Sequence, residues 1–141
     1  MAGEIVLDAS VAAKCFFTEV GSDAARRLAR SGVALIAPDL IFAEIASVAA
    51  KRARRGEAPR EFAQAAVDAL ADLIDVVVPT RDLAVRGFQL AAEHGVSAYD
   101  GIYLALAERR GVRVITADIK LVERASRHGL ADLVDRIDDK I

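Results

Sequence analysis

Short apolar runs alternate with helical patterns along this chain, and this alternation limits the possible folds more than any other feature of the sequence. Four runs have the length and the β-branched content of strands buried on both faces of a sheet. They are residues 4–8 (EIVLD), 33–38 (VALIAP), 74–79 (IDVVVP) and 112–117 (VRVITA), with a weaker fifth at 131–137. Strands that alternate with helices predict an α/β domain with a mainly parallel sheet.

Helix signals fill the intervals between these runs. Residues 10–31 predict one or two short helices, and further helices are expected over 39–55, 59–73, 80–95 and 97–110. Asp39 and Ser97 are expected N-caps, and a helix should begin on Thr80. No internal repeat, low-complexity tract or linker is present, so we expect a single domain over residues 1–141.

Length and composition fit one compact domain. A chain of 141 residues with 54% hydrophobic and 28% charged residues can bury a single core and is not of the disordered type. No stretch of about 18 apolar residues is free of charge and proline, and the first residues lack the basic region of a signal peptide. We therefore expect a cytoplasmic protein. The net charge of −2 excludes an overtly basic nucleic-acid binder, but four acids gathered at one site would leave the remaining surface mildly positive.

Four acidic residues occupy positions where an α/β sheet binds its ligand. Ligands of doubly wound sheets lie outside the carboxyl ends of the strands. Asp8 ends the first predicted strand, and Asp118 follows the fourth. Glu44 and Asp100 interrupt the apolar, core-facing stripes of two predicted helices. We therefore expect the carboxylates of Asp8, Glu44, Asp100 and Asp118 to converge on one pocket.

Each acid also has an explanation that needs no shared site. Asp8 and Asp118 could cap the helices that follow them, and Asp100 stands three residues after Ser97, as in a capping-box variant. Glu44 is in the middle of its helix and caps nothing, so it would need an ion pair with a lysine or arginine. A shared site is excluded only if all four of these explanations are true at once. This requirement favours the shared site.

Four neighbouring carboxylates repel one another, and a hard divalent cation relieves this repulsion. Oxygen-only ligands suit Mg²⁺ or Mn²⁺ rather than zinc. His94 and His128 each precede a glycine at a helix end, where the helix dipole accounts for them, so neither is expected to act as a general base. An acid cluster without histidine indicates metal-activated water, with phosphodiester hydrolysis as the natural chemistry.

Three blocks of the sequence resemble the signature blocks of PIN-domain ribonucleases, and most closely those of the VapC toxins of bacterial and archaeal toxin–antitoxin pairs. The blocks are residues 6–17 (VLDASVAAKCFF), 37–48 (APDLIFAEIASV) and 98–121 (AYDGIYLALAERRGVRVITADIKL). They stand in the family order and, with the helices between them, cover essentially the whole chain. The family's catalytic, metal-binding quartet and its two supporting hydroxyl residues fall on Asp8, Glu44, Asp100, Asp118, Ser10 and Thr116.

The resemblance implies a PIN-like doubly wound α/β/α sandwich with a five-stranded parallel sheet between helices. It also implies dependence on Mg²⁺ or Mn²⁺, cleavage of single-stranded or loop RNA, homodimers, and a VapB-like antitoxin that blocks the site. The sequence departs from the family pattern at two positions: Cys15 stands where tryptophan is common, and Gly101 stands where alanine is frequent. Both departures concern packing and not metal binding. Family members outside toxin systems process RNA, so that role is an alternative.

Contacts to the substrate are less defined by the sequence. The basic run 51–56 (KRARRG), Lys14 and Arg86 could bind phosphate groups, but a basic helix end favoured by the dipole explains the run equally well. Tyr99 and Tyr103 flank an apolar stripe and are expected in the core rather than as platforms for base stacking.

Other proteins with acidic pockets fit less well. A signalling receiver domain would need an acidic pair after the first strand and an aspartate at the end of the third, where the chain reads VVVPT. A haloacid-dehalogenase-type phosphatase would need a second aspartate in place of Ser10. A non-catalytic PIN fold that only binds a partner would have no need of the complete acidic quartet.

Overall fold

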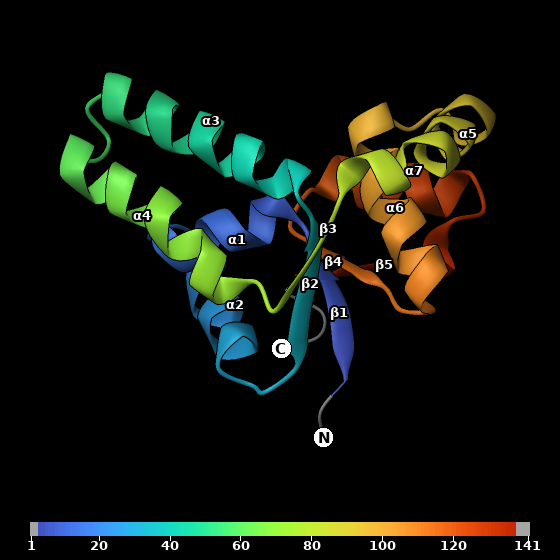
Figure 1. Cartoon of the computed structure of the whole chain (residues 1–141), viewed down its shortest axis with the longest axis horizontal. Helices are drawn as coiled ribbons and strands as arrows, with labels where there is room; N and C mark the ends of the chain where they lie inside the picture. The colour runs from blue at the N-terminus through green and yellow to red at the C-terminus, as the bar shows by residue number, and fades with distance from the viewer. Residues whose placement is uncertain (1–2, 138–141) are drawn as a thin grey trace.

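The computed structural model describes residues 3–137 and forms a five-stranded sheet between helices (Figure 1). The strands are β1 (Glu4–Leu7), β2 (Ala34–Pro38), β3 (Val76–Val78), β4 (Val114–Thr116) and β5 (Val134–Arg136). Their order across the sheet is β3-β2-β1-β4-β5, and each neighbouring pair is parallel. The predicted α/β fold is confirmed, and the sheet is wholly parallel rather than mainly so.

Seven α-helices cover the two faces of this sheet. They are α1 (Ala9–Phe16), α2 (Ser22–Ala29), α3 (Leu40–Arg54), α4 (Arg60–Leu73), α5 (Ala84–His94), α6 (Ala98–Arg110) and α7 (Ile119–Arg127) within the described range. In Figure 1, α1 to α4 lie to one side of the strands and α5 to α7 to the other. The predicted segment 10–31 forms two helices. The helix expected from Thr80 begins with a 3₁₀ turn, Thr80–Asp82, before α5. None of the helices in residues 3–137 has the length and apolarity needed to cross a membrane.

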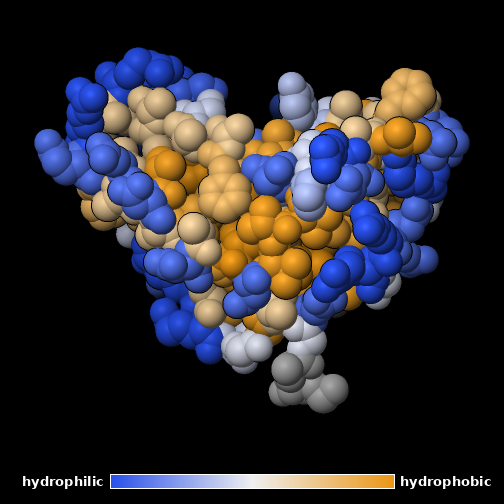
Figure 2. Space-filling view, in the orientation of Figure 1, coloured by the Kyte–Doolittle hydropathy of each residue, from blue (hydrophilic) through white to orange (hydrophobic). Residues whose placement is uncertain are grey.

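The strand order reverses direction at β1. From β1 the chain adds β2 and β3 on one side, and it then returns to add β4 and β5 on the other. The carboxyl ends of β1 and β4 therefore border the crevice in which doubly wound sheets bind ligands. In Figure 1 these ends point toward the space between α3 and α5, and Figure 2 shows the surface hollowed there.

The expectation that all four main strands are buried on both faces is wrong for β3. Val76 and Val77 are 36% and 42% exposed. The reason is the position of β3 at the edge of the sheet, where one side has no neighbouring strand. Figure 2 shows hydrophobic side chains at the surface in this part of the molecule. By contrast, Val6 on β1 and Ile115 on β4 are fully buried in the middle of the sheet.

Two glycines allow α5 and α6 to touch through their backbones. A Cβ atom built on Gly101 would lie 2.3 Å from the carbonyl oxygen of Gly87, far inside any normal contact. The PIN-domain ribonucleases that the sequence resembles often have alanine at the position of Gly101. The glycine found here is a packing feature, as expected. Because Asp100 is the preceding residue, this contact also fixes where α6 presents that acid.

Helix caps connect the ends of neighbouring elements. Ser97 caps α6 as predicted, since its hydroxyl accepts a 3.0 Å hydrogen bond from the Asp100 N–H. Asp39 precedes α3, but its side chain caps no helix and accepts a 2.9 Å bond from the Thr80 N–H instead. The Thr80 hydroxyl accepts in return from the Leu40 N–H at 3.1 Å. The prediction that the Asp39 side chain caps α3 is therefore wrong. This side chain links the segments that follow β2 and β3.

Candidate active site

All four predicted acids line one cavity at the carboxyl ends of the strands. The cavity has a volume of about 370 Å³, and Asp8, Glu44, Asp100 and Asp118 lie around it together with Ser10 and Ser47. Asp8 follows β1 and Asp118 follows β4, while Glu44 comes from the second turn of α3 and Asp100 from the first turn of α6. The structure thus brings together side chains that are up to 110 residues apart in the sequence. Their roles as metal ligands or catalytic groups stay predictions.

Two hydroxyl groups hold the buried carboxylate of Asp8. Its Oδ2 accepts hydrogen bonds from Ser10 Oγ at 2.5 Å and from Thr116 Oγ1 at 2.8 Å. Each hydroxyl also accepts a 3.0 Å bond from a backbone N–H of the turn after β4, Ser10 from Ala117 and Thr116 from Asp118. Asp8 stands at the N-cap position of α1 without a side-chain cap hydrogen bond, and the Ser10 backbone amide contributes only to lowering its pKa, so capping alone does not account for its partners. The hydroxyls instead fix Asp8 against the turn that carries Asp118.

A buried tyrosine holds Glu44. The Tyr103 hydroxyl donates a 2.6 Å hydrogen bond to Glu44 Oε1. Burial, followed by the charges of Asp8 and Glu44, raises the pKa of Tyr103 well above its usual value, so the phenol keeps its proton and is the donor. None of the ion pairs within residues 3–137 includes Glu44, so the lysine or arginine partner considered from the sequence is not seen.

Asp100 and Asp118 have partners at the rim of the cavity. Asp100 Oδ2 lies 3.6 Å from Nη1 of Arg124 on α7. Asp118 Oδ1 accepts hydrogen bonds from the Lys120 and Leu121 amides at 3.0 and 3.4 Å. Asp118 therefore caps α7, as its simpler explanation predicted, and lines the cavity as well.

The acids influence one another electrostatically. Burial is the main cause that raises the pKa of Asp8, Glu44 and Asp100. Neighbouring negative charge adds to it: Asp118 acts on Asp8, Asp8 and Asp100 act on Glu44, and Asp8 and Asp118 act on Asp100. This mutual repulsion is the condition that a bound cation relieves.

The donor chemistry fits a hard divalent cation. Carboxylate and hydroxyl oxygens are ligands suited to Mg²⁺ or Mn²⁺, and no histidine or cysteine of the described part of the chain lines the cavity. Within residues 3–137, no three Asp, Glu, His or Cys side chains are close enough to share one ion. Glu44, Asp100 and Asp118 are held instead by Tyr103, by Arg124 and by the α7 amides. The set fits such an ion by type and charge, and binding would compete with the ion pair between Arg124 and Asp100.

Three of the six predicted phosphate-binding cations are engaged elsewhere. Lys14 Nζ forms a 3.0 Å ion pair with Glu19, and Arg52 pairs with the same carboxylate. Arg86 makes bonds of 2.7 and 3.0 Å to both carboxylate oxygens of Glu108. These contacts favour a structural role for the three cations.

The sequence does not predict the contacts that Tyr103 and Arg124 make with the acids. Tyr103 lies in the core as expected, but the same expectation is wrong for Tyr99, which is 62% exposed. A signal existed for each contact, because Tyr103 follows Asp100 by one helical turn and Arg124 is in the middle of a basic stripe with Lys120 and Arg127. His94 and His128, which were not expected to act in catalysis, are not among the residues that line the cavity.

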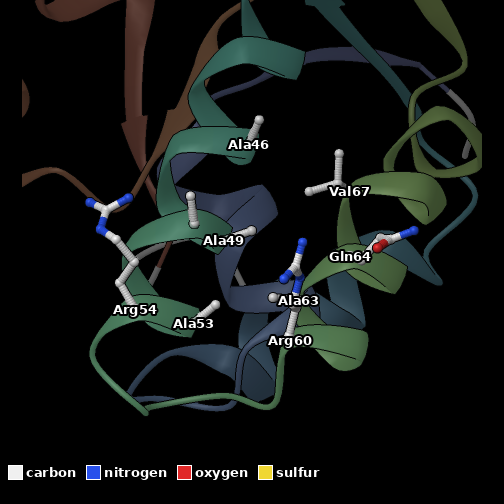
Figure 3. A pocket seen from close by; sticks show the side chains of 9 residues that line it. Ala46, Ala49, Ala53, Arg54, Arg60, Ala63, Gln64 and Val67 are labelled. Atoms are coloured by element: carbon white, nitrogen blue, oxygen red, sulfur yellow. The ribbon is translucent and has the colours of Figure 1, made fainter.

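A larger cavity, of about 420 Å³, lies between α3 and α4 (Figure 3). Alanines of both helices and Val67 form most of its lining, with Arg54, Arg60 and Gln64 beside them. Among residues 3–137, the side chains that line it include no acid, histidine or cysteine. This groove therefore offers an apolar contact surface rather than catalytic groups.

Comparisons with known proteins agree with the fold. Residues 5–127 match the family model of the PIN domain, and the chain belongs to this family. It is 32% identical over 123 residues to Ribonuclease VapC3 of Pyrobaculum aerophilum, a match that covers 86% of this chain and 94% of that protein.

Two solved structures share the fold at low sequence identity. PAE2754 of Pyrobaculum aerophilum has a TM-score of 0.68 at 21% identity, with 99% of this chain and 94% of that chain covered. VapBC2 of Rickettsia felis has a TM-score of 0.67 at 10% identity, with 96% and 98% covered. The family match and the relative confirm the resemblance to the PIN-domain family, and these two structures confirm its fold.

Proposed function

We propose that this protein is a metal-dependent endoribonuclease that hydrolyses RNA phosphodiester bonds, and that it is the toxin of a VapBC-type toxin–antitoxin pair. The observation that carries the proposal is the gathering of Asp8, Glu44, Asp100 and Asp118 around one cavity at the switch point of the sheet. The similarity to a protein named as a ribonuclease supports the same reaction. The proposal treats residues 1–141 as one PIN domain and, because RNA is the substrate, places the reaction in the cytoplasm.

The carboxylates and their partners have distinct tasks in this reaction. Mg²⁺ or Mn²⁺ bound by the acids would supply Lewis-acid activation of the phosphoryl group and of water. Ser10 and Thr116 hold Asp8 in one orientation through neutral hydroxyl donors. Asp118, which also caps α7, is the acid whose replacement the reaction should tolerate best.

Cations on α7 lie where RNA phosphates would approach the acids. Arg124 is 3.6 Å from Asp100, and Lys120 and Arg127 are four and three residues from it along the same helix face. Lys120 and Arg127 are exposed. Phosphate groups on either side of the bond to be cut would meet positive charge there.

The central test is an RNA cleavage assay with purified protein freed of any co-expressed partner. Cleavage should require Mg²⁺ or Mn²⁺ and stop in EDTA. Asp8→Asn, Glu44→Gln and Asp100→Asn should each abolish most of it, and Asp118→Asn should reduce it less. Asp68→Asn, at an exposed acid on α4, is the matched control and should cut RNA as the wild type does. Unchanged cleavage in EDTA would contradict the proposal.

The toxin role and the nuclease chemistry can be tested separately. Expression without an antitoxin should slow growth, whereas expression of the Asp8→Asn protein should not. Cleavage without any effect on growth would favour the alternative, an RNA-processing PIN nuclease outside a toxin system. Failure of the folded protein to cut RNA with Mn²⁺ would favour a PIN fold that only binds a partner.

We also propose that two copies of the protein pair and that a VapB-like antitoxin covers further surface. Val85 and Phe88 are one turn apart on α5 and are largely exposed, which suits a helix-to-helix contact between copies. Light scattering should show a dimer at micromolar concentration, and Phe88→Ser should shift it to a monomer. The apolar groove between α3 and α4 suits an antitoxin segment, and an antitoxin arginine could pair with the acids of the cavity.

A further inference from the structure

We propose that Tyr103 is a positioning residue, which holds the Glu44 carboxylate in the orientation needed to bind a divalent cation. The proposal rests on the proposed function, in which Glu44 is a metal ligand. It is based on a direct contact between a core side chain and an acid of the cavity. Tyr103 is 1% exposed, and its hydroxyl donates a 2.6 Å hydrogen bond to Glu44 Oε1.

Helix α6 presents two side chains to the cavity region from successive turns. Asp100 lines the cavity directly, and Tyr103, three residues later, reaches the acid that α3 contributes. The ring of Tyr103 is packed in the main hydrophobic core. A tyrosine has few rotatable bonds, so a packed ring gives its hydroxyl a nearly fixed position. The Tyr103 hydroxyl can therefore fix the distance between Glu44 on α3 and helix α6.

The kind of donor is as informative as its position. Asp8 is held by the hydroxyls of Ser10 and Thr116, and Glu44 by the hydroxyl of Tyr103. These donors are neutral, so they orient the carboxylates without cancelling the negative charge that attracts a cation. A lysine or arginine at the same place would do the opposite. The cation near the site, Arg124, contacts Asp100 at the rim.

Tyrosine could also be present only to fill the core, and Tyr103→Phe separates the two roles. Phenylalanine keeps the ring and its packing and removes the hydroxyl alone. Loss of a side chain that orients a metal ligand typically weakens metal affinity about 10- to 100-fold. Tyr99→Phe is the matched control, because Tyr99 is on the same helix, undergoes the same chemical change and is 62% exposed.

The experiment measures Mn²⁺ binding by calorimetry and, in parallel, the Mn²⁺ concentration that gives half-maximal RNA cleavage. Tyr103→Phe should raise the Kd for Mn²⁺ and the half-maximal Mn²⁺ concentration about 10-fold or more. The kcat at saturating Mn²⁺ should fall much less. Circular dichroism should show an unchanged fold. Tyr99→Phe should match the wild type. In a Glu44→Gln background, Tyr103→Phe should have no further effect on Mn²⁺ binding, because the two residues act as a pair.

Two outcomes would overturn the positioning role. One is a Tyr103→Phe protein that binds Mn²⁺ as tightly as the wild type, and the other is an equal loss of affinity in the Glu44→Gln background. The proposed function fails in a different way. A wild type that binds Mn²⁺ but cuts no RNA would refute the nuclease, while the calorimetric comparison would still decide the role of Tyr103.

Discussion

Thr116 donates a 2.8 Å hydrogen bond to Asp8 across the two strands that meet at the centre of the sheet. The two residues are 108 positions apart, but β1 and β4 are parallel neighbours in which Leu7 pairs with Ile115. Asp8, which directly follows β1, and Thr116, the last residue of β4, therefore meet at the same edge. The order of the strands, rather than distance along the chain, assembles the cavity.

Thr116→Val should destabilise the protein and impair cleavage. The buried hydroxyl donates to Asp8 and accepts from the Asp118 N–H, so valine leaves both groups without this partner. A loss of about 1–3 kcal/mol in the free energy of unfolding is expected, measured by urea denaturation. Thr116→Ser keeps the hydroxyl and should restore most of the cleavage activity. A valine variant that equals the wild type in both measurements would remove Thr116 from the site.

The sequence predicted the site better than it predicted the contacts within it. Asp8 and Asp118 were predictable because they follow strands whose carboxyl ends must meet in a parallel sheet. Glu44 was predictable because a charged residue in the middle of an apolar helix stripe needs a reason to be there. Each of these arguments uses only local pattern and topology.

The missed contacts depend on how helices pack against one another. The bond from Tyr103 to Glu44 joins α6 to α3, and the pair of Arg124 and Asp100 joins α7 to α6. Helical periodicity gives the face of a residue but not the neighbour that this face meets. The exposure of β3 was missed for a related reason, since a run of valines is equally compatible with a central strand and an edge strand.

Gly101→Ala should reduce stability although alanine is the better helix former. The added Cβ would lie 2.3 Å from the Gly87 carbonyl oxygen, so α5 and α6 would have to move apart. We expect a loss of about 1–3 kcal/mol, measured by thermal or urea unfolding. Gly3→Ala, at a glycine with no atom near its Cβ position, is a control that should change little. Equal stability of Gly101→Ala and the wild type would show that the helices can separate at no cost.

Asp8→Asn should stabilise the protein in EDTA, and the gain should grow with pH. Burial, and then the charge of Asp118, raises the pKa of Asp8 in the folded state above that of the unfolded chain. The folded state then binds a proton more readily, so stability is lost as the pH rises above the ordinary carboxyl range of about 4. The melting temperature of the variant should exceed that of the wild type at pH 7 and approach it near pH 4.

A second carboxylate gives the opposite dependence and serves as the control for this experiment. The hydrogen bond from Arg86 lowers the pKa of Glu108. Its contribution to stability is therefore present at neutral pH and is lost as the pH falls through the lowered pKa. Glu108→Gln should lower the melting temperature at pH 7, if it changes it at all, and should not raise it. A destabilised Asp8→Asn protein at pH 7 would contradict the raised pKa of Asp8 in the folded state.

Arg124→Gln should weaken RNA binding more than the loss of an equal charge elsewhere. Arg124 lies beside Asp100 at the rim of the cavity, so its charge is close to any phosphate that reaches the acids. Binding of a single-stranded RNA in EDTA, followed against salt concentration, should lose about 0.7 from the slope of log K against log salt. Arg27→Gln, at an exposed residue of α2, should leave the slope unchanged. Identical slopes for the two variants would exclude Arg124 as a phosphate contact.

The products of cleavage should carry a 5′-phosphate and a 3′-hydroxyl. The cavity contains carboxylates and hydroxyls but no histidine that could take a proton from the RNA's own 2′-hydroxyl. Water is therefore the expected nucleophile, and its attack on phosphorus in line with the departing 3′-oxygen leaves the phosphate on the 5′ end of the downstream fragment. A 5′-phosphate-dependent exonuclease should degrade that fragment, and mass spectrometry of the upstream fragment should show a free 3′-hydroxyl. An RNA in which the 2′-hydroxyl at the cut is replaced by hydrogen should still be cut, because that group takes no part in the attack. A 2′,3′-cyclic phosphate on the upstream fragment would mean that the acids around this cavity serve a different mechanism.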